Sequence, residues 1–126
     1  MTQVLAIGLG GLLGTMARFG LSNLVQRVSG ISFPLGTLVV NVAGCLAIGV
    51  VVYFTEDRQS VGPAARLFLT AGVLGGFTTF SAFGVETASL IREGNYWSAG
   101  LNVGLSVVLG LGAVWAGRSL MKVIAG

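Results

Sequence analysis

Four long stretches without a charged residue constrain the fold of this chain more than any other feature. They cover positions 1–17, 28–55, 67–85 and 94–117 of the 126 residues. A bilayer core of roughly 30 Å requires about 20 helical residues at about 1.5 Å rise each. Only 9% of the residues are charged, whereas an average soluble domain carries about 25%. We therefore predict a membrane protein with four spans.

The charged and polar positions between these stretches set the expected ends of the spans. We place the spans at about 2–25, 33–54, 64–91 and 96–121, in one transmembrane domain that covers residues 1–126. Four apolar strands are too few for a closed barrel, and an open sheet leaves unpaired backbone groups in lipid. The predicted fold class is an all-α, multi-pass protein of the plasma membrane, which is the inner membrane in a bacterium.

The third span has a centre that is poorly suited to a continuous helix. Small and hydroxyl residues crowd it: Gly72, Gly75, Gly76, Thr78, Thr79 and Ser81. Glycine costs about 1 kcal/mol relative to alanine inside a helix, and Ser and Thr hydroxyls compete for backbone hydrogen bonds. We predict a break near residues 75–79. Unwound backbone at membrane depth marks binding sites in transporters.

Glycine accounts for 21 of the 126 residues, and some of these glycines are spaced for helix packing. Gly10 and Gly14 are four residues apart, as are Gly100 and Gly104. Small residues at this spacing let helix backbones approach closely. We predict tight helix packing at both pairs.

The positive charges give almost no signal for orientation. The side of the membrane that holds both termini carries four: Arg58, Arg66, Arg118 and Lys122. The opposite side carries three: Arg18, Arg27 and Arg92. Because cytoplasmic loops normally carry an excess of Lys and Arg, this balance predicts insertion in both orientations and head-to-tail pairing. One fixed orientation, set by another feature, is the alternative.

Polar side chains inside the spans are the first candidates for function. Asn41 lies in the middle of the second span, where an unpartnered amide costs several kcal/mol. It either makes a hydrogen bond between helices or binds a substrate in a pore. Asn102 and Ser106 are four residues apart on one face of the fourth span. They indicate either a hydrated path or hydrogen bonds that hold helices together.

Aromatic and ionisable residues add further candidates. Phe80 and Phe83 are expected to share a face beside the break, either as packing residues or with their positive ring edges turned toward an anion. Arg18 and Glu86 are the deepest ionisable side chains, and charges inside a membrane generally face a cavity or a partner. Arg18 can equally extend to the membrane interface.

Three motifs, taken in order, resemble the Fluc (CrcB) family of fluoride channels. They are GGLLGTMAR at 10–18, GTLVVNVAG at 36–44 and GGFTTFSAF at 75–83. The resemblance covers nearly the whole chain and implies an antiparallel, dual-topology homodimer with two parallel fluoride pores. It also implies a structural Na⁺ where two broken third helices cross, held by the backbone carbonyls of Gly75 and Thr78.

The resemblance also assigns roles to single residues. Asn41 matches the family's pore asparagine, and Phe80 and Phe83 match its two pore phenylalanines. With the polar candidates added, the expected fluoride-binding residues are Asn41, Phe80, Phe83, Thr79, Ser81, Asn102 and Ser106. Arg18 and Glu86 are expected to line a vestibule.

The chemistry of these residues fits fluoride conduction. Fluoride is small and strongly hydrated, so a pore must replace its water with donors. Amide, hydroxyl and ring-edge donors are neutral, and they release the anion more readily than a ring of lysines or arginines. We expect a passive, fluoride-selective channel that exports cytoplasmic fluoride and relieves its toxicity. The chain is not expected to be an enzyme, because it has no nucleophile–base pair or nucleotide loop.

Two other functions stay open at this point. A small dual-topology, proton-coupled multidrug exporter needs a carboxylate buried in mid-span, and only Glu86 lies near such a position. A structural membrane subunit without transport does not explain Asn41, the polar stripe and the break together. Nucleic-acid binding is not expected, because the chain has no run of basic residues. A His or Cys metal site is excluded, since the chain has no His and one Cys.

Overall fold

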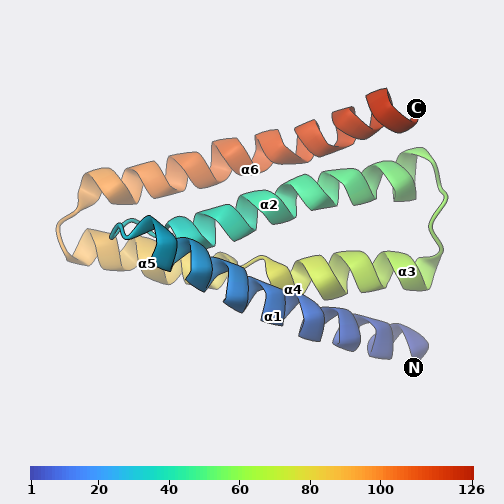
Figure 1. Cartoon of the computed structure of the whole chain (residues 1–126), viewed down its shortest axis with the longest axis horizontal. Coiled ribbons are helices and arrows are strands. Elements are labelled where there is room, and N and C mark those ends of the chain that lie inside the picture. Colours follow the sequence, from blue (N-terminus) through green and yellow to red (C-terminus); the bar gives the residue numbers. More distant parts are fainter.

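The computed structural model describes residues 1–126 and consists of helices with short connections. Four segments are long and apolar enough to cross a membrane: Thr2–Ser29, Leu35–Asp57, Pro63–Arg92 and Tyr96–Ala125. The predicted all-helical class with four spans is confirmed. Both chain ends and the loop after the second span lie at one end of the bundle, and the other two loops lie at the opposite end (Figure 1).

Each span is built from one or more helical elements. The first is α1 (Thr2–Ser29) and the last is α6 (Tyr96–Ala125). The second is α2 (Leu35–Val52), which continues directly into the π-helical turn η1 (Tyr53–Asp57). The third consists of α3 (Pro63–Leu67), the π-helical segment η2 (Phe68–Leu74), α4 (Gly75–Phe77) and α5 (Phe80–Arg92).

The first span continues past its expected end at Val25. Gly30 ends α1 in the left-handed conformation, with φ 65°, and its N–H donates to the Gln26 carbonyl. Glycine favours this position after a helix because it lacks a Cβ. Arg27 therefore lies in the last helical turn, where a cation is stabilised by the free carbonyls, and not beyond the helix.

Hydrogen bonds from charged side chains connect the C-terminal part of α6 to the end of the second span. Asp57 accepts hydrogen bonds from Arg118 Nε at 2.9 Å and from Arg118 Nη2 at 2.5 Å. Arg58 Nη1 donates to the carbonyl of Ala125 at 3.0 Å. With these contacts, α6 extends to Ala125, past the expected end near Met121.

The third span is interrupted within the stretch where the sequence predicts a break. Thr78 and Thr79 have extended backbones, with φ/ψ of −95°/156° and −149°/116°. Helix α4 therefore ends at Phe77, and α5 starts at Phe80. Thr79 caps α5, since its Oγ1 accepts the N–H of Ala82 at 3.1 Å. The predicted break is confirmed, and it falls at the end of the predicted stretch.

Glycines let α1 lie directly against the broken span. A Cβ at Gly10 would overlap the Phe68 carbonyl, and a Cβ at Gly14 would overlap the Val73 carbonyl. The close packing predicted for this pair is confirmed. Figure 1 shows α1 crossing the third span obliquely at this contact.

The second glycine pair does not pack within the single chain. A Cβ at Gly100 or Gly104 would meet nothing within 4 Å, so no helix of the same chain makes the contact predicted for this pair. The reason is the rotation of α6, which turns a different glycine, Gly117, toward α2. A Cβ at Gly117 would overlap the Leu46 carbonyl.

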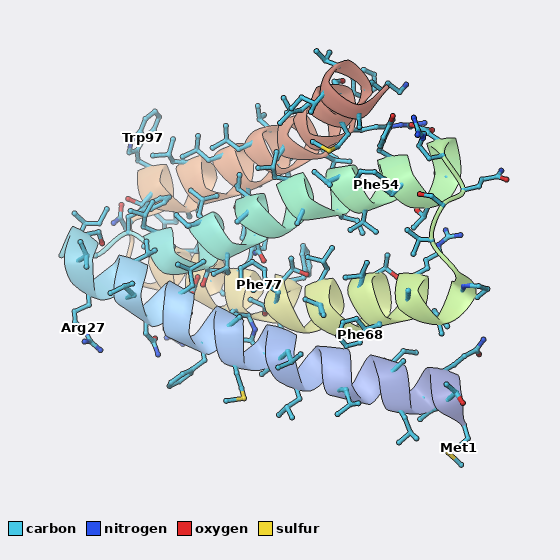
Figure 2. All side chains as sticks on the ribbon, turned by 45° about the vertical axis from the view of Figure 1, so that its right-hand side comes forward. Met1, Arg27, Phe54, Phe68, Phe77 and Trp97 are labelled. Atoms are coloured by element: carbon cyan, nitrogen blue, oxygen red, sulfur yellow. The ribbon has the colours of Figure 1, made fainter.

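One chain alone has little interior. Only 16 of the 126 residues are buried. Figure 2 shows side chains projecting outward along α1 and Trp97 projecting from the start of α6. Large apolar side chains on the outside are expected where lipid or a second protein chain replaces water.

Candidate functional site

Asn41 on α2 pairs with the break in the third span. Its Nδ2 donates to the Thr79 carbonyl at 2.9 Å, and the Thr79 N–H donates to its Oδ1 at 2.8 Å. One side chain therefore satisfies both backbone groups of Thr79, which lies outside any helix. The amide group has a second N–H, and no hydrogen bond within the chain uses it.

The break also frees two backbone carbonyls. In a continuous helix, the Gly75 carbonyl would accept the Thr79 N–H, and the Thr78 carbonyl would accept the Ala82 N–H. Here the Thr79 N–H bonds to Asn41, and the Ala82 N–H bonds to the Thr79 hydroxyl. No hydrogen bond from a turn, loop or side chain ends on either carbonyl. Gly75 is exposed on the surface of the chain.

A cavity of about 420 Å³ lies at the break, between α2, the third span and α6. Most of the predicted site residues line it: Asn41, Gly75, Thr78, Thr79, Phe80, Phe83 and Ser106. No charged side chain lines the cavity. Residues from three spans, far apart in the sequence, thus meet around one space.

Phe80 and Phe83 lie together at the start of α5. Their ring centroids are 5.4 Å apart, and the rings are tilted by 45°. The expectation that they share a face is confirmed. Phe80 is 82% exposed in the single chain, so it is not a core packing residue of this chain.

The serines near the break differ in their hydrogen bonding. Ser106 Oγ is buried and has no partner. Nearly all buried polar groups are hydrogen-bonded, so an unpartnered hydroxyl on a residue of the cavity wall is unusual. Ser81 Oγ lies 3.3 Å from Thr79 Oγ1, and Ser81 is not part of the cavity wall.

Asn102 does not reach the cavity. It is only 1% exposed, and its Nδ2 donates to Thr87 Oγ1 at 3.0 Å. The Thr87 hydroxyl in turn donates to the Phe83 carbonyl at 2.7 Å. Of the two alternatives for the polar stripe on α6, Asn102 makes the hydrogen bond between helices, whereas Ser106 lies in the cavity wall.

The two ionisable candidates lie outside the cavity wall and are hydrogen-bonded to protein. Arg18 Nε donates to the Gly76 carbonyl at 3.0 Å. Glu86 Oε1 accepts from Thr37 Oγ1 at 2.7 Å, and Glu86 Oε2 is buried without a partner. Arg18 therefore contacts the bundle interior and does not simply extend to the membrane interface.

Six residues of the cavity wall were not among the predicted site residues: Gly44, Cys45, Ile48, Thr70, Leu74 and Val107. Gly44 and Cys45 follow Asn41 by about one helical turn and line the cavity beside it. A Cβ at Gly44 would overlap the methyl group of Thr78, so this glycine lets the break approach α2. The spacing of three and four residues from Asn41 was a signal that could have found both.

Known proteins match this chain over nearly its full length. The family model described as CrcB-like protein, Camphor Resistance (CrcB), matches residues 5–118. The chain belongs to the CrcB family. This confirms the resemblance carried by the three sequence motifs. The break lies in the third of these motifs, and Asn41, which pairs with it, lies in the second.

Three curated relatives of this CrcB protein are each named "Fluoride-specific ion channel FluC". The relative from Opitutus terrae is 51% identical over 94% of this chain and 91% of its own length. The relative from Nitratidesulfovibrio vulgaris is 45% identical over 98% of this chain and 100% of its own length. The relative from Methylobacillus flagellatus is 46% identical, with 97% and 96% covered.

Proposed function

We propose that this chain forms a passive, fluoride-selective ion channel. The observation that carries the proposal is the cavity at the break, where neutral donors and aromatic rings from three spans meet without a charged residue. The relatives named as fluoride-specific ion channels support the same function. Since ion channels transport and do not catalyse a reaction, these relatives confirm that the chain is not an enzyme.

Three kinds of neutral group replace the water around fluoride in this cavity. Asn41 offers the N–H that Thr79 does not use, and Ser106 offers its unpartnered hydroxyl. Phe80 and Phe83 offer positive ring edges. Because none of these groups carries a full charge, the anion binds well enough to enter and weakly enough to leave.

The cavity favours passive flow over coupled export. A proton-coupled multidrug exporter needs a carboxylate at its substrate site, and no carboxylate lines this cavity. Glu86 lies outside the wall and bonds to Thr37. Fluoride flux therefore follows the fluoride gradient and the membrane voltage. Fluoride enters cells as the neutral acid and is trapped as the anion, so outward flow relieves its toxicity.

The working channel is an antiparallel dimer of this chain. Its support is the small interior of one chain, the 82% exposure of Phe80 beside the cavity, and the balanced positive charges of the two membrane sides. A two-fold axis in the membrane plane relates two copies in opposite orientations. Each copy then covers the break of the other. The same symmetry produces the cavity twice and hence two pores.

A structural Na⁺ between the two breaks fits the free carbonyls. Unwound backbone carbonyls in transporters coordinate Na⁺ in this manner, and no hydrogen bond from a turn or loop ends on the Gly75 or Thr78 carbonyl. Gly75 is exposed, as a ligand shared between two chains must be. Gly75 and Thr78 of both copies would hold the ion. The bound ion would supply the positive charge that keeps the carbonyls of two chains together.

Removal of Na⁺ is expected to separate the dimer. Replacing NaCl by N-methylglucamine chloride at equal ionic strength leaves the exposed carbonyls without a bound cation, because the organic cation is too large to enter. Light scattering of the purified protein in detergent measures the dimer, and returning Na⁺ should restore it. A dimer and a fluoride flux that are both unchanged in the organic cation would contradict the structural role of Na⁺.

Growth on fluoride tests export and dual topology together. In cells without their own fluoride exporter, the chain should restore growth at an inhibitory fluoride concentration. A copy with three lysines added at its C-terminus should be held in one orientation and should fail when expressed alone. Co-expression with a copy that carries added lysines in the loop after Ser29 should restore growth.

Either of two results would count against these proposals. Growth restored by one orientation-locked copy alone would reject dual topology. Growth that no combination restores, although the unaltered chain is present in the membrane, would reject fluoride export.

A further inference from the structure

We propose that Arg18 is a positioning residue, which holds the break in its conducting shape through one hydrogen bond to the Gly76 carbonyl. The inference rests on the proposed channel function and concerns how its site is built. The bond runs from Arg18 Nε to Gly76 O, measures 3.0 Å, and joins residues 58 positions apart in the sequence. The guanidinium therefore acts as a donor to the backbone and not as a charge that attracts fluoride.

The Gly76 carbonyl needs a donor because the break removes its helical partner. In a continuous helix it would accept the N–H of Phe80, four residues later. The extended backbone of Thr78 and Thr79 prevents this bond, since Phe80 starts a new helix. A carbonyl without a donor is costly at membrane depth, and Arg18 replaces the missing N–H.

A second contact brings Arg18 within reach of this carbonyl. A Cβ at Gly76 would lie 2.7 Å from the Gly11 carbonyl and 3.0 Å from Thr15 Oγ1. The backbone of Gly76 therefore lies directly against α1. Arg18 follows Thr15 by three residues and projects from the same face of the helix.

The break is thus held from two sides by side chains that replace its lost backbone bonds. Arg18 on α1 binds Gly76, and Asn41 on α2 binds both backbone groups of Thr79. With these bonds made, the Gly75 and Thr78 carbonyls lose the donors that a continuous helix would give them. Arg18 therefore determines which carbonyls the break leaves free and where α5, with its two phenylalanines, begins.

The atom that makes the contact distinguishes positioning from charge. Arg18 is absent from the cavity wall, and it bonds Gly76 through Nε and not through the terminal nitrogens. Glutamine carries an N–H donor at the same number of bonds from Cα as arginine Nε, and it is neutral. Lysine keeps the charge but has a methylene at that position. Methionine has neither a charge nor a donor.

Fluoride efflux from liposomes with Arg18→Gln, Arg18→Lys and Arg18→Met tests the inference. The Gln variant should keep a rate within about threefold of the unaltered channel. The Lys and Met variants should each lose about tenfold, as expected for a lost hydrogen bond to a charged donor. The control is Arg27→Met, which removes an exposed arginine from the same helix and should leave the rate unchanged.

Dimer mass in detergent is measured for every variant. A Met variant that fails to assemble, beside a Gln variant that assembles and conducts, supports positioning. A Lys variant that conducts while the Gln variant does not would assign the role to charge and overturn the inference. Equal rates in all variants, or loss in all three Arg18 variants, would overturn it as well. Absence of fluoride flux in the unaltered protein would count against the channel function itself.

Discussion

An aspartate in place of Asn41 is expected to abolish fluoride flux. The carboxylate has no N–H, so it cannot donate to the Thr79 carbonyl, which Asn41 Nδ2 reaches at 2.9 Å. The substitution also removes the second N–H, which is proposed to donate to fluoride, and it places a negative charge in the path of an anion. Together these losses correspond to a fall of about a hundredfold or more in the initial rate of efflux from liposomes.

The same chemical change elsewhere provides the control. Asn23→Asp alters an exposed asparagine of α1 and should leave the flux unchanged. If an Asn41→Asp protein forms the dimer and conducts fluoride at the unaltered rate, Asn41 is neither a pore donor nor needed to hold the break.

Replacing Phe80 by isoleucine is expected to reduce flux steeply while the protein still assembles. Phe80 is 82% exposed in the single chain, so the substitution disturbs little of the chain's own packing. Isoleucine keeps most of the bulk but lacks the positive ring edge. The loss of such an aromatic contact predicts a fall of about tenfold in the efflux rate. Methionine, which is polarizable, should retain more flux than isoleucine.

Phe19→Ile is the matched control for this substitution. Phe19 is also exposed, at 70%, but it lies on α1 away from the cavity. Its replacement should not change the flux. Equal flux with phenylalanine, isoleucine and methionine at position 80 would mean that the rings take no part in conduction.

The number of spans and the break followed from local composition. Charged residues are costly in lipid, so uncharged stretches mark the spans directly. Glycine and threonine disfavour a helix wherever they gather, which locates the break to within a few residues. Its position at Thr78 and Thr79 was not predictable in this way, because it depends on hydrogen bonds to Asn41, 38 positions away in the sequence.

The polar residues of α6 show that the site, like the break, depends on contacts between segments distant in the sequence. Asn102 and Ser106 share a helical face, and their spacing alone suggests one path for both. In the structure Asn102 is opposite Thr87 of α5, whereas Ser106 is opposite the cavity. The difference arises from where α5 restarts after the break, and periodicity within α6 contains no information about that.

Helix ends and outer surfaces were predictable only in part. The first span was expected to end near residue 25, but Gly30 acts as a C-terminal cap and α1 extends to Ser29. Gly100 and Gly104 have a spacing that is typical of helix contacts, yet they face away from the rest of the chain. What covers such a surface depends on molecules outside the chain, whether lipid or a second copy.

Paired measurements of fluoride and chloride efflux, from liposomes that contain the purified protein, test selective passive conduction most directly. The membrane voltage is controlled with K⁺ and valinomycin, and the pH is equal on both sides. Fluoride should leave rapidly down its gradient, and chloride should leave far more slowly. Chloride efflux as fast as fluoride efflux, or fluoride movement that requires a proton gradient, would contradict the channel assignment.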